Sequence, residues 1–156
     1  CIFVKLHDIL HLNFCLSIKT KNMIRLEHLG IAVKNLEESN ELFEKMLGRP
    51  HYKTEEVELE HVKTAFFKVG ESKIELLEAT ADESAIAKYV EKRGEGLHHV
   101  AFEVEDIYAE MERLKAEGFR LLSEQPKPGA DNKLVCFVHP KSANGVLLEL
   151  CQEIKS

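Results

Sequence analysis

The chain has 156 residues, of which 44% are hydrophobic, and a formal net charge of -6. This length and apolar content suffice for a compact domain with a buried core. The acidic balance, and the lack of a basic run interleaved with aromatic residues, exclude a general nucleic-acid-binding protein. We therefore expect a small-molecule partner and no nucleic acid.

The first 22 residues differ from the rest of the chain. They mix apolar residues with scattered lysine and histidine, and the orderly pattern begins at Met23. Their apolar run, residues 9–18, is interrupted by polar residues and is too short to span a bilayer. We predict a non-native or poorly ordered extension over residues 1–22, with a targeting peptide as the alternative, a single domain over residues 23–156 and no membrane partner.

The first structural unit begins with a strand. Residues 26–33 alternate with a two-residue period, which places the large apolar side chains on one face and His28 on the other. A helix is expected over residues 36–47, with Asn35 as its N-cap and Gly48 at its end. Three further strands are expected over residues 52–59, 62–69 and 73–78.

A linking helix is expected next, over residues 82–93, with Asp82 as its cap and Ile86, Tyr89 and Val90 on its buried side. The order of the first unit then returns. A strand over residues 97–104 precedes a helix ended by Gly118. The expected elements of this second unit are the strand 97–104, the helix 107–117 and the strands 119–124, 133–139 and 146–152.

Both units have the order βαβββ. The sequence therefore predicts an α+β fold of two tandem βαβββ modules, over residues 24–80 and 96–153, that form a curved mixed sheet around a metal-binding cavity. Cys136 and Cys151 lie in apolar, strand-like runs, where a thiol behaves as a small hydrophobic side chain. We expect a reducing compartment and place the protein in the cytoplasm.

Histidine and glutamate occupy matching positions in the two modules. His28 and His99 fall in the first strand of each module, and Glu75 and Glu149 fall in the last. A carboxylate within an apolar strand is costly to bury unless it is charge-paired or metal-bound. Taken singly, these residues fit satisfied core histidines and solvent-facing glutamates, but their symmetric recurrence favours a divalent-metal site with open positions. Cobalt, manganese, zinc and nickel are all compatible with these ligands.

Two other residues are interpreted differently. Alternation places His98 on the face that a helix would cover, so we predict that it is not a ligand. Lys133 lies near a strand end, where a phosphate could bind, but we interpret it as a solvated surface residue.

Four segments resemble the methylmalonyl-CoA epimerase family, and residues 23–153 resemble the wider vicinal oxygen chelate superfamily. The segments are Ile74-Glu75-Leu76-Leu77-Glu78, the link from Asp82 to Lys88, Gly94-Glu95-Gly96-Leu97-His98-His99-Val100-Ala101-Phe102, and His139-Pro140-Lys141-Ser142 through Leu150. The resemblance implies that His28, His99 and Glu149 bind the metal, with Glu75 in the remaining protein position. It also implies Glu149 as a catalytic acid-base group and a homodimer.

The implied reaction interconverts (R)- and (S)-methylmalonyl-CoA. It removes the α-proton through a metal-stabilised enolate and returns a proton to the opposite face, so two acid-base groups are needed. Several members of the family carry a glutamate at the position of Thr64, and threonine is a poor base. The second group therefore stays open among Glu75, a water and another residue.

Three other functions stay open. A glyoxalase I type lactoylglutathione lyase has similar ligands, although the linking helix and the epimerase-like segments favour the epimerase. A non-enzymatic small-molecule binding (resistance) protein is a second alternative, which the absence of tryptophan disfavours. An extradiol dioxygenase is the third, but it would leave Glu75 without a role.

Overall fold

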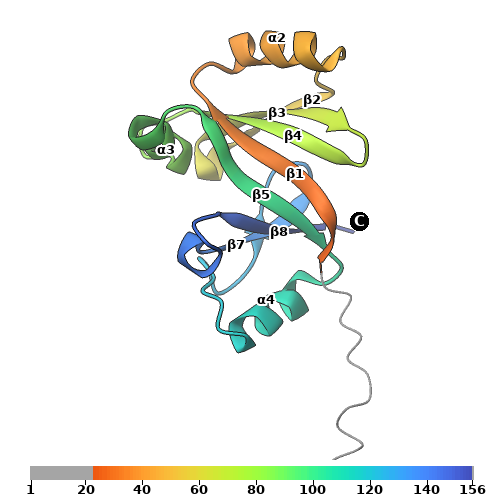
Figure 1. Ribbon diagram of the computed structural model, residues 1–156, viewed down its shortest axis with the longest axis vertical. Coiled ribbons are helices and arrows are strands. Elements are labelled where there is room, and N and C mark those ends of the chain that lie inside the picture. Colours follow the sequence, from red (N-terminus) through yellow and green to blue (C-terminus); the bar gives the residue numbers. More distant parts are fainter. Residues whose placement is uncertain (1–22, 156) are drawn as a thin grey trace, which may run out of the picture.

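The computed structural model describes residues 23–155, which form one eight-stranded mixed sheet in the order β2-β3-β4-β1-β5-β8-β7-β6 (Figure 1). At its centre β1 (Met23–Val33) pairs antiparallel with β5 (Gly96–Val104). On the two outer sides β1 pairs parallel with β4 (Ser72–Ala79), and β5 pairs parallel with β8 (Leu148–Glu153). The two predicted βαβββ modules therefore lie side by side, joined along β1 and β5. The prediction for residues 1–22 lies outside the described residues.

Module one follows the predicted order closely. Helix α2 (Leu36–Leu47) is capped by Asn35, whose side chain accepts a hydrogen bond from Glu38 N at 3.1 Å. Gly48 ends the helix with φ 69°, a left-handed conformation that favours glycine. Strands β2 (Lys53–Val57) and β3 (Val62–Val69) follow. The strand predicted over residues 52–59 is shorter than expected, because residues 58–60 form a 3₁₀ turn.

The linking helix α3 spans Ala85–Arg93, and the predicted cap, Asp82, is wrong. Ser84 is the N-cap, because its hydroxyl accepts a hydrogen bond from Ile86 N at 3.2 Å. The predicted buried side is confirmed. Ile86 is buried, and Tyr89 and Val90 pack with it against residues of β1, β3 and β4.

Module two departs from the prediction after its helix α4 (Ile107–Ala116). The strand expected over residues 119–124 is wrong, because Leu121 makes only an isolated bridge to Val138. The second strand of the module is instead the two-residue β6 (Lys127–Pro128), which pairs with β7 (Lys133–Val138). Pro126 precedes β6 and Pro128 lies within it, and proline donates no backbone hydrogen bond, so β6 stays a short strand at the edge of the sheet.

The helices α2 and α4 cover the outer face of the sheet at the two ends of the molecule (Figure 1). Phe67 and Leu76 form the core under α2, and Ile107, Met111 and Leu150 form the core under α4. The cysteines Cys136 and Cys151 are buried and free. The inner face of the sheet lines a cavity.

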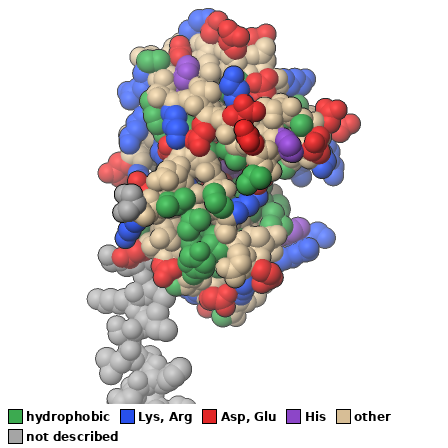
Figure 2. Space-filling model, turned by 180° about the vertical axis from the view of Figure 1, so that it is seen from behind, with side chains coloured by type: hydrophobic (Ala, Val, Ile, Leu, Met, Phe, Trp, Pro, Cys, Tyr) green, Lys and Arg blue, Asp and Glu red, His purple; other side chains and the backbone are tan. Residues whose placement is uncertain are grey.

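The surface carries many charged side chains of both signs. Acidic and basic side chains are intermixed over the face drawn in Figure 2. None of the helices within residues 23–155 is long and apolar enough to cross a membrane.

Candidate metal centre

A cavity of about 310 Å³ lies on the inner face of the sheet, between the two modules. His28 and Glu75 from module one line it, and Glu149 from module two lines it opposite them. The remaining wall is largely apolar and includes Phe66, Phe137 and Leu77. A concave apolar site with a few convergent polar groups is the common form of a small-molecule site.

The four side chains singled out in the sequence converge at one point, where His28, Glu75 and Glu149 line the cavity and His99 contacts all three. His28 Nε2 lies 2.9 Å from His99 Nε2, and Glu75 Oε2 lies 3.2 Å and 3.5 Å from these two nitrogens. The Glu149 carboxylate lies 3.9 Å from His28 Nε2 and 3.4 Å from His99 Nε2. None of the four is more than 5% exposed. Strands from both modules thus bring two imidazoles and two carboxylates together.

The donors fit a divalent cation. Ligand atoms of His28, His99 and Glu149 lie within 4.8 Å of one another, and the Glu75 carboxylate lies beside both imidazoles. Mixed nitrogen and oxygen donors suit cobalt, manganese, zinc and nickel. These four residues would hold the ion.

The electrostatic field at this point favours positive charge. Burial alone lowers the pKa of His28, but hydrogen bonds to Glu27 and Glu75 and the charges of Glu75 and Glu149 outweigh it and raise this pKa to about 10. Burial raises the pKa of Glu149. Burial alone would also raise the pKa of Glu75, but hydrogen bonds to the two imidazoles hold it well below its usual range. A cation at the centre would replace the proton on His28.

A β-bulge brings a further carboxylate to the centre, which strict alternation had concealed. Leu26 pairs with Phe102 and His28 with Ala101, so Glu27 is an extra residue on β1 and turns to the side of His28. Its Oε2 lies 2.6 Å from His28 Nδ1. Metal-binding histidines commonly donate their second ring N–H to such a carboxylate.

Two lysines accompany Glu27 in the cavity. Lys73 Nζ lies 2.5 Å from Glu27 Oε1, and Lys133 Nζ lies 3.5 Å from the same oxygen. Lys133 is only 8% exposed, so its interpretation as a solvated surface residue is wrong. It begins β7 and faces the buried carboxylate, a pairing that sequence alternation did not indicate.

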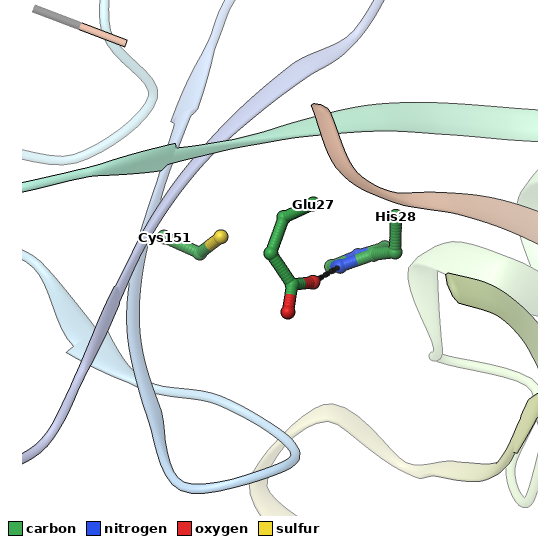
Figure 3. A group of neighbouring side chains, drawn as sticks. All are labelled: Glu27, His28 and Cys151. Carbon is green, nitrogen blue, oxygen red and sulfur yellow. Dashed lines mark hydrogen bonds and ion pairs between the residues drawn. The ribbon is translucent and has the colours of Figure 1, made fainter. Parts of the chain in front are cut away.

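Glu27, His28 and Cys151 form a second cluster whose donor atoms lie within 4.8 Å of one another. Figure 3 shows the Glu27 carboxylate joined to the His28 ring, with the Cys151 side chain on the other side of Glu27. Burial strongly raises the pKa of this thiol, so it is protonated at neutral pH. Since Glu27 is also paired with Lys73, this cluster does not fit a cation.

Thr64 is engaged with a candidate ligand. Its hydroxyl donates a hydrogen bond to Glu75 Oε1 at 3.0 Å and is fully buried. The other oxygen of Glu75 faces the imidazoles. Thr64 thus orients Glu75, a contact that its place in the sequence did not indicate.

A second bulge explains the position of His98. Gly30 pairs with His99 and Ile31 with Leu97, which leaves His98 as the extra residue on β5. The assumed alternation is therefore wrong at this point, and His98 lies beside His99 with their Nδ1 atoms 2.9 Å apart. Burial and the nearby charge of His99 lower the pKa of His98 to about 4. Its absence from the ligand set stays a prediction.

The imidazole of His99 lies directly over Gly30. A β-carbon at this position would lie 2.1 Å from His99 Cε1, closer than any real contact, and the His99 ring is held on three sides by His28, His98 and Phe137.

We expect Gly30→Ala to displace the His99 ring and weaken cobalt binding, measured by titration. The control is Gly70→Ala, because Gly70 has φ 62° but open space around it. That variant should lose stability and keep its cobalt affinity. Equal cobalt affinities in the two variants would contradict the argument.

The chain is similar to proteins of one known superfamily. The sequence pattern of the glyoxalase/bleomycin resistance protein/dioxygenase superfamily matches residues 27–137. The chain belongs to this superfamily. The resemblance predicted from the sequence and the predicted fold class are confirmed.

Within the superfamily the similar proteins include named epimerases. The chain is 42% identical to the ethylmalonyl-CoA/methylmalonyl-CoA epimerase of Cereibacter sphaeroides, over 82% of this chain and 97% of that protein. It is 42% identical to the mitochondrial methylmalonyl-CoA epimerase of Dictyostelium discoideum, over 81% of this chain and 76% of that protein. A structure of the Streptomyces coelicolor methylmalonyl-CoA epimerase in complex with 2-nitronate-propionyl-CoA matches with a TM-score of 0.83 and 34% identity, covering 86% of this chain and 100% of that chain.

Proposed function

We propose that this protein is a methylmalonyl-CoA epimerase, which interconverts the (R) and (S) forms of its substrate. One observation carries the proposal. The side chains of His28, Glu75, His99 and Glu149 converge at one point beside the cavity. The chain also aligns with a named epimerase over 97% of that protein's length. The acyl-CoA substrate is carried over from those relatives, one of which has a CoA ester bound.

The four residues have distinct roles in this proposal. They would hold a divalent ion, which supplies Lewis-acid stabilisation of the negative charge that develops on the substrate when its α-proton leaves. Glu149 lines the cavity and exchanges the α-proton on one face. Glu75 and the two histidines hold the centre, and the apolar wall limits the access of water.

Glu149 alone does not complete the inversion, because a proton must return from the opposite face. The Thr64 hydroxyl already donates to Glu75 and does not serve as the base. The second proton transfer is left to Glu75, a water or another group of the cavity wall, which also includes Glu60.

The deciding experiment follows proton exchange at the α-carbon. Purified protein with added cobalt or manganese is incubated with methylmalonyl-CoA in deuterated water, and deuterium incorporation is measured by mass spectrometry. We expect incorporation that stops when a chelator removes the ion and resumes when the ion returns. A hemithioacetal of glutathione serves as the matched substrate for a glyoxalase I type lyase. Turnover of that compound alone would overturn the epimerase proposal.

Assembly and location complete the proposal. We propose a homodimer in the cytoplasm, with buried, reduced Cys136 and Cys151 as the support for a reducing compartment. The Dictyostelium relative is named as mitochondrial. Gel filtration with light scattering tests the dimer, and localisation of the tagged full chain tests the compartment.

A further inference from the structure

Glu27 is a buried carboxylate to which the proposed chemistry gives no role. Its side chain is 1% exposed, and its Oε2 accepts a hydrogen bond from His28 Nδ1 at 2.6 Å. The opposite ring nitrogen, Nε2, faces His99, Glu75 and Glu149. A hydrogen bond at Nδ1 fixes both the ring orientation and the proton position, and so leaves the Nε2 lone pair for a metal ion.

Lys73 connects Glu27 with the other module. His28 and Lys73 are direct partners in the parallel pairing of β1 and β4, so Lys73 reaches the Glu27 carboxylate from the neighbouring strand. Its Nζ also lies 2.7 Å from Asp131 Oδ2. Asp131 belongs to the loop between β6 and β7, in module two.

The Asp131 loop is itself held against module one. The backbone N–H of Asp131 donates to Glu55 Oε2 at 3.0 Å, and its carboxylate accepts from Lys53 Nζ at 3.2 Å and from Tyr52 Oη at 3.3 Å. Asp131 also adopts φ 54°, a conformation that aspartate tolerates better than most residues. These contacts fix the carboxylate that holds Lys73.

We propose that Glu27 is a positioning residue for His28, and that Asp131 sets it through Lys73. The relay Asp131–Lys73–Glu27–His28 then makes the orientation of a module-one ligand depend on a loop of module two. This inference rests on the proposed metal-dependent function, because it assigns the relay to the same centre.

The charge of Glu27 explains why the relay needs Lys73. Glu27 lies in an interior that already holds Glu75 and Glu149, and an unpaired carboxylate there would be strongly destabilised. Lys73 balances Glu27, and Asp131 keeps the ammonium group in place. Lys133 lies farther from the same carboxylate oxygen and makes a weaker contribution.

The experiment measures cobalt binding by the full chain through the visible absorption of cobalt(II) and competition with a chelator. Glu27→Leu removes the acceptor of the His28 Nδ1–H and should weaken cobalt binding by about 10- to 100-fold and change the absorption bands. Glu27→Gln restores an acceptor oxygen and should recover most of the affinity. The matched control is Glu103→Leu, which removes a carboxylate paired with Arg25 that does not touch His28 and should keep wild-type affinity.

The relay is tested separately by a double-mutant cycle. Asp131→Ala should weaken cobalt binding in the wild-type background and have no further effect in the Lys73→Met background. Asp131 is partly exposed, so its replacement should not prevent folding, and the cycle can be measured even if Glu27→Leu fails to fold. Unchanged affinity in Glu27→Leu, or an undiminished effect of Asp131→Ala beside Lys73→Met, would overturn the inference.

Failure of the relay and failure of the proposed function give different results. A wild-type protein that binds cobalt but exchanges no α-proton overturns the epimerase and leaves the cobalt measurements valid. A wild-type protein that exchanges the proton, with Glu27→Leu binding cobalt equally well, overturns the relay alone.

Discussion

We expect replacement of His99 with alanine to abolish both metal binding and α-proton exchange, and replacement of His98 with alanine to leave both measurable. The two histidines are neighbours in the chain, but only His99 Nε2 faces the other candidate ligands, at 2.9 Å from His28 Nε2 and 3.4 Å from Glu149. His98 contacts the opposite side of the His99 ring and packs against Tyr89 of α3. The pair therefore separates a ligand from a residue that supports it.

The expected sizes of these losses differ. His99→Ala should lower cobalt affinity by more than about 100-fold, since loss of a ligand exceeds the usual cost of losing an outer partner. His98→Ala removes a hydrogen-bond partner of His99 and should cost no more than about 10- to 100-fold. Cobalt titration and deuterium incorporation are measured on both variants, with thermal unfolding as the check on folding. Complete loss of cobalt from His98→Ala, with His99→Ala unaffected, would refute the assignment.

We expect replacement of Glu149 with glutamine to lower the rate of α-proton exchange by about 10²- to 10⁴-fold, the usual contribution of a general base. Glutamine keeps an oxygen that can contact the ion, but it cannot carry the proton. The raised pKa that burial gives Glu149 brings this carboxyl closer to the range in which it can accept and return a proton. The rate is measured at saturating cobalt so that weaker binding does not limit it.

The matched variant is Glu75→Gln. Glu75 lies as close to the two imidazoles, and the amide oxygen of glutamine can take its place at the centre. We therefore expect Glu75→Gln to keep exchange at a rate well above that of Glu149→Gln. The reverse order of rates would assign the base to Glu75 and contradict the role of Glu149.

The fold was predictable because local signals and duplication agree. The period of two in residues 26–33 and the caps Asn35 and Gly48 predicted the first strand and helix, and the structure confirms both. The recurrence of that order in the second half then predicted the second module. The strand predicted over residues 119–124 is wrong, because only Leu121 pairs there, and the prolines at 126 and 128 keep the strand that does form, β6, to two residues.

The candidate site was predictable only where alternation holds. Glu75 and Glu149 lie in strands without a bulge, and their side chains face the cavity as the period of two predicts. Glu27 and His98 lie at bulges, which reverse the face of one residue and leave no clear mark in a single sequence. Lys73 and Asp131 were missed for another reason. Their partners lie on other strands and loops, so only the folded chain shows which charges meet.

The pairing of β1 with β5 also determines when the candidate metal centre can form during folding. His28 and His99 are 71 positions apart, and Glu149 lies still later in the chain, so the centre closes some of the longest loops in the protein. Contacts of such separation form late, because the entropy of loop closure must be overcome first. Either module alone offers one imidazole and one carboxylate, too few for tight binding of an ion. High-affinity metal uptake therefore follows docking of the two modules, and it stabilises the docked state over the separated one.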